Sequence, residues 1–212
     1  MESANVMKRI VAVASGLVWA AAILAGLWIS WGYENTPGIA GVPPSQWPAD
    51  SEVQLAADRA TLVMLAHPHC PCSRASIDEL SLLMTRGQGR VTAYVLFVRP
   101  AGLPDGWEKS DLWHSAAAIP GVNVLSDAGG VEARRFQATT SGDVVLYDSQ
   151  GRLLFSGGIT GSRGHSGDNV GRSSIVALLT QGTAERTQTF VFGCPLLDSS
   201  SKCDREAESC NQ

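Results

Sequence analysis

The chain is 212 residues long, is 44% hydrophobic and carries a formal net charge of −4. This length allows one ordinary domain with accessory segments. The 16 lysines and arginines are scattered and are outnumbered by 20 acidic residues, which excludes the basic surface that nucleic-acid binding requires. Five cysteines are few for a disulfide scaffold, so their positions carry the information about function.

The N-terminus predicts a single membrane-spanning signal-anchor over residues 10–31. This uncharged apolar run is long enough to cross a hydrocarbon core of ~30 Å. A cleaved signal peptide is the alternative, because Ala20–Ala22 could imitate a cleavage site. Lys8 and Arg9 precede the run, so we expect residues 1–9 in the cytoplasm, with the anchor in the inner (plasma) membrane. The remainder of the chain would then face the periplasm or exterior, where disulfides persist.

Prolines and glycines in residues 32–50 predict a semi-extended tether between the membrane and a domain over residues 51–182. In the domain, strands and helices alternate and then end in a hairpin and a closing helix. This order predicts an α/β fold with a mixed sheet flanked by helices. The expected strands are 61–66, 91–98, 122–125, 143–147 and 153–155, and the expected helices are 71–87, 110–119, 131–137 and 172–179; residues 53–59 fit either a short helix or an edge strand. Residues 183–212 form a tail with three of the five cysteines.

Two cysteines lie where the first strand becomes a helix. If the helix starts at Pro71, Cys70 is its N-cap residue, and Pro71 loses no hydrogen bond because the first helical N–H has no partner. Unpaired amides and the helix dipole favour a thiolate at Cys70, and Arg74 and His69 could add positive charge. A thiolate is the nucleophile in thiol–disulfide exchange, so the turn predicts redox chemistry in which Cys70 attacks and Cys72 resolves.

This turn and the elements after it resemble those of thioredoxin-like proteins. The stretch AHPHCPCSRASIDEL is similar to the A-x-W-C-x-x-C-R-x-x-x-P-x-L turn of membrane-tethered, periplasm-facing members of that group. More narrowly, HPHCPCSRAS, TTSGDVVLYDSQGRLLFSGGITGSRGHSGDNVGR and VFGCPL resemble the RedB type. The resemblance covers roughly residues 51–182 and implies a thioredoxin-like fold and thiol–disulfide oxidoreductase activity that requires no cofactor. The implied partners are exported protein thiols or a redox partner in the membrane.

The chain departs from the thioredoxin pattern in two places. Its cysteine spacing is C-x-C, so either Cys70 matches the nucleophile with Ser73 in the resolving position, or Cys72 matches the second cysteine with His69 in the first. A Cys70–Cys72 disulfide would close a small ring and would be labile and relatively oxidising. Thioredoxins also keep a cis-proline opposite their cysteines, whereas this chain has the loop 140–142 (Thr-Ser-Gly), which puts the usual backbone docking of a substrate in question.

His69, Cys70 and Cys72, with His165 as a distant partner, form an alternative set of metal ligands. Thiolate and imidazole together suit Cu(I) or Zn, and thioredoxin-fold copper carriers combine a cysteine pair with a distal histidine. A metal carrier that uses the same cysteines is therefore the second hypothesis. A redox sensor or scaffold without turnover is a third, and a structural disulfide or inert thiols at Cys70 and Cys72 would have no catalytic role.

The glycine-rich loop 157–171 has two interpretations. It could lie near the cysteine turn, with Arg163, His165 and Asp168 contacting a substrate or metal. It could equally be a flexible connection in which Asp168 or Asn169 caps the last helix.

Cys194, Cys203 and Cys210 lie in the tail, and in an exterior compartment two of them are expected to pair. Such a pair would staple the tail to the domain surface. Cys194, within a Phe-Gly-Cys-Pro turn, could instead resolve a mixed disulfide on Cys70 or join an intermolecular bond.

Overall fold

The computed structural model describes residues 2–87 and 89–197. The chain divides between Thr36 and Pro37 into two units, an N-terminal helix and a compact domain. Two of the three tail cysteines are expected to pair, and of these three Cys203 and Cys210 lie outside the described residues.

The N-terminal unit is a single helix, α1 (Glu2–Asn35), which is long and apolar enough to cross a membrane. It extends beyond the expected residues 10–31 at both ends. At its C-terminal end, the Asn35 amide donates to the Trp31 carbonyl at 2.8 Å and the Thr36 hydroxyl donates to the Gly32 carbonyl at 2.7 Å. These side chains satisfy carbonyls that a helix end leaves without partners, which explains why the helix continues past residue 31.

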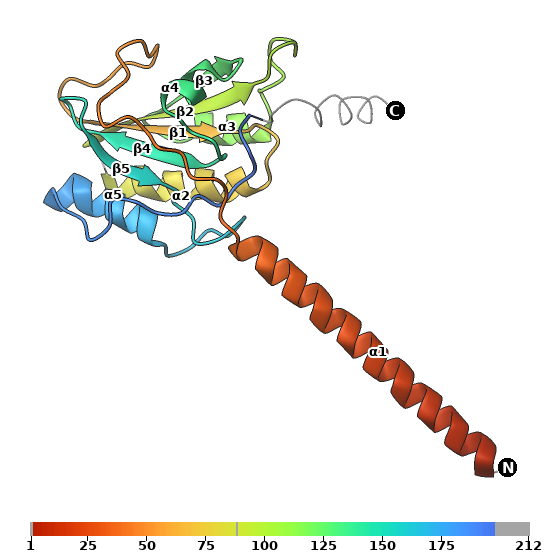
Figure 1. Ribbon diagram of the computed structural model, residues 1–212. Helices are drawn as coiled ribbons and strands as arrows, with labels where there is room; N and C mark the ends of the chain where they lie inside the picture. The colour runs from red at the N-terminus through yellow and green to blue at the C-terminus, as the bar shows by residue number, and fades with distance from the viewer. Residues whose placement is uncertain (1, 88, 198–212) are drawn as a thin grey trace. The chain divides into compact units, whose positions relative to one another are not determined.

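The domain is built on a five-stranded mixed sheet in the order β3-β2-β1-β4-β5 (Figure 1). Strands β1, β2 and β3 are parallel, whereas β4 pairs antiparallel with both β1 and β5. The strands are β1 (Ala60–Ala66), β2 (Val91–Arg99), β3 (Val122–Ala128), β4 (Asp143–Tyr147) and β5 (Leu153–Gly157), and the helices are α2 (Cys72–Gly87), α3 (Asp111–Ala117), α4 (Val131–Arg135) and α5 (Val170–Gln181). The predicted class, a mixed sheet flanked by helices, is confirmed.

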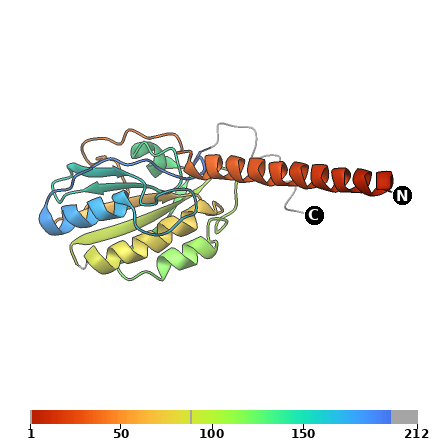
Figure 2. The same ribbon diagram turned by 90° about the horizontal axis from the view of Figure 1, so that it is seen from below.

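Both faces of the sheet are buried, because successive residues of the central strands alternate between two apolar cores. Leu62 and Met64 of β1 point to the core under α2, α3 and α5, whereas Val63 and Leu65 point to the core under α4. Figure 1 shows α2 and α5 on one side of the sheet and α4 on the other, and Figure 2 shows α3 beside α2. Burial on both faces explains the almost continuous apolar run in β1.

Residues 37–50 pack along the domain, which differs from the tether predicted over residues 32–50. The Tyr147 hydroxyl donates to the Pro44 carbonyl at 2.8 Å, and the Trp47 ring meets the rings of Phe136 and Tyr147 edge-on at centroid distances of 5.2 Å. Close approach of the backbone at Gly41 leaves no room for a Cβ beside the Gln137 carbonyl. Proline keeps this segment extended, but its Trp47 buries apolar area on the domain and so fixes it there.

Residues 53–59, for which either a helix or an edge strand was expected, form neither. Val53 is instead buried in the core under α4, and the backbone N–H of Ala56 donates to the Thr61 hydroxyl at 2.9 Å. Contacts with distant residues, and not a regular helix or strand, hold this stretch in place. Its sequence therefore shows neither the helical nor the strand pattern of apolar residues.

Candidate active site

The cysteine turn joins the end of β1 to the start of α2. The Cys70 N–H donates to the His67 carbonyl at 3.2 Å, and the Ser73 N–H donates to the Cys70 carbonyl at 3.0 Å. The first regular residue of α2 is Cys72, one position later than expected, because this first turn is closed by bonds between residues three apart. Cys70 nevertheless lies directly before the helix, where the dipole and the unpaired amides favour a negative charge.

The loop 140–142 faces this turn, and Ser141 ties the two together. The Ser141 hydroxyl accepts a hydrogen bond of 2.7 Å from the His67 N–H and lies 2.7 Å from the Ser73 hydroxyl oxygen. The Gly142 N–H donates to the Leu65 carbonyl at 2.8 Å, which seats the loop on the end of β1. All peptide bonds in the described residues are trans, so the loop that stands opposite the cysteines has neither the proline nor the cis bond of the thioredoxin pattern.

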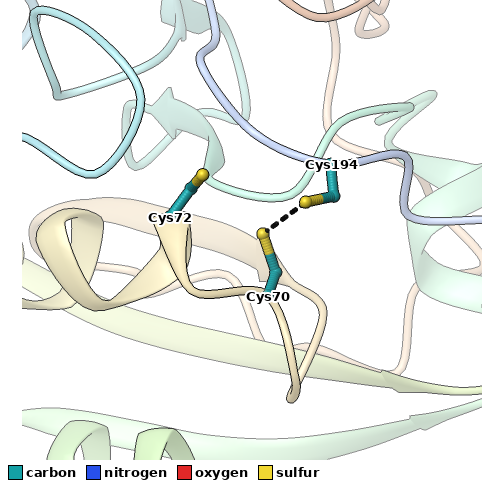
Figure 3. Close-up of side chains that lie close together, drawn as sticks. All are labelled: Cys70, Cys72 and Cys194. Carbon is teal, nitrogen blue, oxygen red and sulfur yellow. Dashed lines mark hydrogen bonds between the residues drawn. The ribbon is translucent and has the colours of Figure 1, made fainter. Parts of the chain in front are cut away.

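Three cysteine thiols meet at this place. The sulfurs of Cys70 and Cys194 share a hydrogen bond of 2.9 Å, and the Cys72 sulfur completes a group whose members all lie within 4.8 Å of one another (Figure 3). Cys70 and Cys72 come from the start of α2, and Cys194 comes from a separate C-terminal stretch of chain and points its sulfur toward Cys70 (Figure 3). Cys70 and Cys72 are buried and Cys194 is half-buried.

The charge in this group is concentrated on Cys70. Hydrogen bonding from Cys194, above all, lowers the pKa of the Cys70 thiol to about 4, with the Ser73 hydroxyl as a further donor and burial opposing the shift. The pKa of Cys72 is raised, first by burial and then by the charge on Cys70. The pKa of Cys194 is also raised, but here the first cause is its hydrogen bond to the Cys70 thiolate. The arrangement therefore holds one thiolate beside two protonated thiols.

Arg163 supplies a positive charge that acts on this group. Its guanidinium donates to the Gly193 carbonyl, and its charge lowers the pKa of Cys72 and of Cys194. Of the three loop residues that could lie near the cysteine turn, Arg163 does so. Asp168 instead forms an ion pair of 2.9 Å with Arg172, which ties the loop to the start of α5.

Arg74, for which we expected contact with the thiolate, lines a surface cavity of about 280 Å³ together with His69 and Cys70. The Ser110 hydroxyl closes one side of this cavity by donating to the Pro68 carbonyl at 2.7 Å. Cys70 is only 2% exposed, so this cavity is where it borders the surface.

The two histidines of the metal hypothesis lie outside the sulfur group. The His69 ring packs against Trp107, with centroids 4.5 Å apart, and His165 Nδ1 lies 2.8 Å from the Arg163 carbonyl oxygen. Among the described residues, the His, Cys, Asp and Glu side chains that could together hold a metal ion are the three cysteines alone. Of the ligands in the metal hypothesis, Cys70 and Cys72 lie in this group, and its third member is Cys194 and not a histidine.

Comparison with solved structures shows that other proteins share this fold. The chain is similar to an uncharacterised conserved protein of Geobacillus kaustophilus, with a TM-score of 0.55 and 20% identity over 79% of this chain and 95% of that one. It is similar to a hypothetical protein of Sinorhizobium meliloti, with a TM-score of 0.54 and 20% identity over 78% and 96% of the two chains. A looser match, with a TM-score of 0.42 and 15% identity over 58% and 82%, is a secreted disulfide oxidoreductase of Mycobacterium tuberculosis. No protein-family model matches the sequence, and no curated protein matches it.

Proposed function

We propose that this protein is a membrane-tethered thiol–disulfide oxidoreductase of the RedB type that faces the cell exterior. Its attacking group is the Cys70 thiolate at the start of α2. Helix α1 would be the anchor, and the charges of Lys8 and Arg9 before its apolar run would keep the N-terminus inside. Its partners would be exported protein thiols or a redox partner in the membrane.

The observation that carries this proposal is the thiolate of Cys70 with further thiols in contact. A thiolate attacks a disulfide sulfur, and a second thiol nearby can then release the mixed disulfide. Two protein thiols and one substrate disulfide thereby become one protein disulfide and two substrate thiols, a transfer of two electrons. A pKa of about 4 keeps Cys70 in the reactive form at every physiological pH.

The proposal is tested with the full-length protein in detergent, reduced and then mixed with an oxidised model peptide. We expect one peptide disulfide to be reduced per protein molecule, and this activity to be lost in Cys70→Ser. Thr85→Ala, an exposed change on α2, is the control and should react like the wild type. Equal peptide reduction by Cys70→Ser and the wild type would contradict the assignment of Cys70.

A metal carrier remains the second candidate, because three sulfurs within 4.8 Å of one another suit Cu(I) or Zn. Here Cys70, Cys72 and Cys194 would be the ligands, and His69 and His165 would not be ligands. Metal analysis of the reduced protein after dialysis separates the two functions. Stoichiometric Cu(I) that is retained without any disulfide exchange would favour the carrier, whereas exchange without retained metal would favour the oxidoreductase.

A further inference from the structure

The C-terminal segment, residues 187–196, adds an extended stretch beside the loop that faces the cysteines. The Ser141 N–H donates to the Cys194 carbonyl at 2.7 Å, and the Leu196 N–H donates to the Thr139 carbonyl at 2.9 Å. Between them, Thr140 and Pro195 form an antiparallel bridge. Cys194 is thus presented to Cys70 on an extended segment that pairs with the loop from Cys194 to Leu196 (Figure 3).

The segment is seated along its length. Upstream of Cys194, the Ser156 N–H donates to the Thr187 carbonyl and the Thr189 N–H donates back to the Ser156 carbonyl, at 3.0 and 3.2 Å. Val191 and Leu196 are 4% and 2% exposed, so the segment is also held by buried apolar side chains. A Cβ at position 193 would overlap the Ser141 carbonyl, so the close approach beside Cys194 requires glycine.

The pairing of the C-terminal segment with the loop depends on the absence of a proline at Ser141. A proline has no N–H, so a proline in place of Ser141 could not donate to the Cys194 carbonyl. The loop therefore carries a donor at the position from which the C-terminal segment is held. Strand addition of this kind is a general way in which an extended peptide docks, and here the peptide is part of the same chain.

We infer that Cys194 is the resolving thiol of the reaction and that the redox disulfide of this protein is Cys70–Cys194, with the C-terminal segment acting as a built-in strand that positions it. This inference rests on the proposed oxidoreductase function and deepens it. It replaces Cys72, which the sequence predicts as the resolving residue, with a cysteine more than a hundred residues away in the chain.

The reaction proceeds in two balanced steps. The Cys70 thiolate attacks a substrate disulfide, forms a mixed disulfide and releases the first substrate thiolate. The Cys194 thiol gives its proton to the released substrate thiolate, and the resulting Cys194 thiolate attacks the Cys70 sulfur, releases the second substrate thiolate and leaves the Cys70–Cys194 disulfide. A dithiol reductant, supplied by a partner protein or by dithiothreitol in the test tube, reduces this disulfide and restores both thiols.

Formation of the mixed disulfide activates Cys194, the thiol that already touches the Cys70 sulfur. The pKa of Cys194 is raised first by the Cys70 thiolate, and that negative charge disappears when Cys70 becomes part of a disulfide. The charge of Arg163 then favours the Cys194 thiolate. Burial raises the pKa of both Cys72 and Cys194, and Arg163 lowers both, so the choice between the two thiols rests on contact: the Cys194 sulfur is the one that lies 2.9 Å from the Cys70 sulfur. Cys194 therefore becomes a better nucleophile at the moment when it is needed.

The test uses the full-length protein and glutathione disulfide, a small symmetric disulfide. Reduced wild type, Cys72→Ala and Cys194→Ala are mixed with it, quenched with acid at intervals and analysed by intact mass and peptide mapping. In the wild type and in Cys72→Ala we expect a short-lived glutathione adduct, followed by a Cys70–Cys194 peptide. In Cys194→Ala the adduct on Cys70 should persist at least about tenfold longer.

Gly193→Ala keeps all three thiols but disturbs the seat of the segment, so it should also prolong the adduct, and the control Thr85→Ala should not. Thermal unfolding confirms that each variant is folded. A Cys70–Cys72 peptide in the wild type, with an equally short-lived adduct in Cys194→Ala, overturns the inference and leaves the oxidoreductase function standing. A Cys70 that glutathione disulfide does not modify in any variant overturns both.

Discussion

At the scale of single residues, the reactivity of Cys70 depends on a neighbour that the local sequence does not contain. The helix start supplies a favourable field, as the turn predicts. The largest cause of its low pKa, however, is the hydrogen bond from Cys194. Ser73, which follows in the same turn, contributes less. The thiolate is thus a property of the assembled domain more than of the C-x-C motif.

We expect the rate at which iodoacetamide alkylates Cys70 to be nearly independent of pH between about 6 and 8, because the thiolate is already fully formed above a pKa of about 4. An ordinary thiol would react about tenfold faster for each unit of pH in this range. In Cys194→Ala, where the main donor is absent, the rate should regain a rise with pH. Mass spectrometry of the Cys70 peptide measures it, and a flat profile in Cys194→Ala would contradict this account.

Asp143, the first residue of β4, is a second residue with an unusual ionisation. Burial raises the pKa of its carboxyl to about 7, from an ordinary value of 3.8. The carboxyl lines a cavity of about 690 Å³ that Gly41 and Thr160 also border. A folded-state pKa above the unfolded one means that protonation stabilises the fold. This contribution is complete below about pH 4 and is lost as the pH rises through about 7.

Asp143→Asn should therefore stabilise the protein relative to the wild type at about pH 8 and have little effect at about pH 4, because asparagine imitates the protonated carboxyl. Urea unfolding of both proteins at the two pH values measures the difference. The same change in the exposed Asp58, whose pKa is lowered by its hydrogen bond to Arg59, is the control and should not give this pattern. A stabilisation by Asp143→Asn that is equal at both pH values would rule out the titration of Asp143 as its cause.

At the scale of elements, a buried ion pair holds the glycine-rich loop and its Arg163 in place. Arg172 of α5 pairs with Glu79 of α2, and both side chains are almost completely buried. The Glu79 carboxylate also accepts hydrogen bonds from the Gly167 N–H and the Asn169 amide. Asn169 in turn caps α5 by accepting from the Arg172 N–H at 2.8 Å. Two helices and a loop thus share one polar cluster.

Arg172→Leu should destabilise the domain by about 3–5 kcal/mol, because it leaves the Glu79 carboxylate buried without its cation. Arg152→Leu removes an exposed ion pair with Asp148 and should cost less than about 1 kcal/mol. Chemical denaturation of the two variants gives the comparison. If both changes cost the same, the buried cluster does not support the loop as described.

The same scale separates what the sequence could predict from what it could not. Strands such as β1 and helices such as α2 follow from apolar runs and helical periodicity, and the strand-to-helix turn placed Cys70 and Cys72 correctly. Residues 37–50 and 187–196 have no such periodicity, because each is fixed by pairing with parts of the chain that are distant in sequence. Cys194 joins the site through such a pairing. Gly193 is a sign of this pairing only when the structure shows the Ser141 carbonyl beside Gly193.

At the scale of the whole molecule, the domain is closed by segments from both ends of its sequence. Residues 37–50 cover the face under which Phe136 and Tyr147 lie, and the C-terminal segment runs along β5 to the cysteines. The Gly38 N–H donates to the Val191 carbonyl at 2.8 Å, so the two segments are bonded to each other. The mixed sheet and its helices are thus bordered by two terminal segments, and the C-terminal one brings Cys194 to Cys70.

The 124 residues that separate Cys70 from Cys194 have a consequence for folding thermodynamics. A covalent bond between them would tie most of the domain into one loop and remove about 5 kcal/mol of chain entropy from the unfolded state, whereas a Cys70–Cys72 bond would remove about 1.5 kcal/mol. The oxidised protein should consequently melt on the order of 10 °C above the reduced protein. Calorimetry with and without dithiothreitol measures this gap, which should fall in Cys194→Ala to no more than the smaller gap that a Cys70–Cys72 bond would give. Heat resistance would then report the redox state of the molecule.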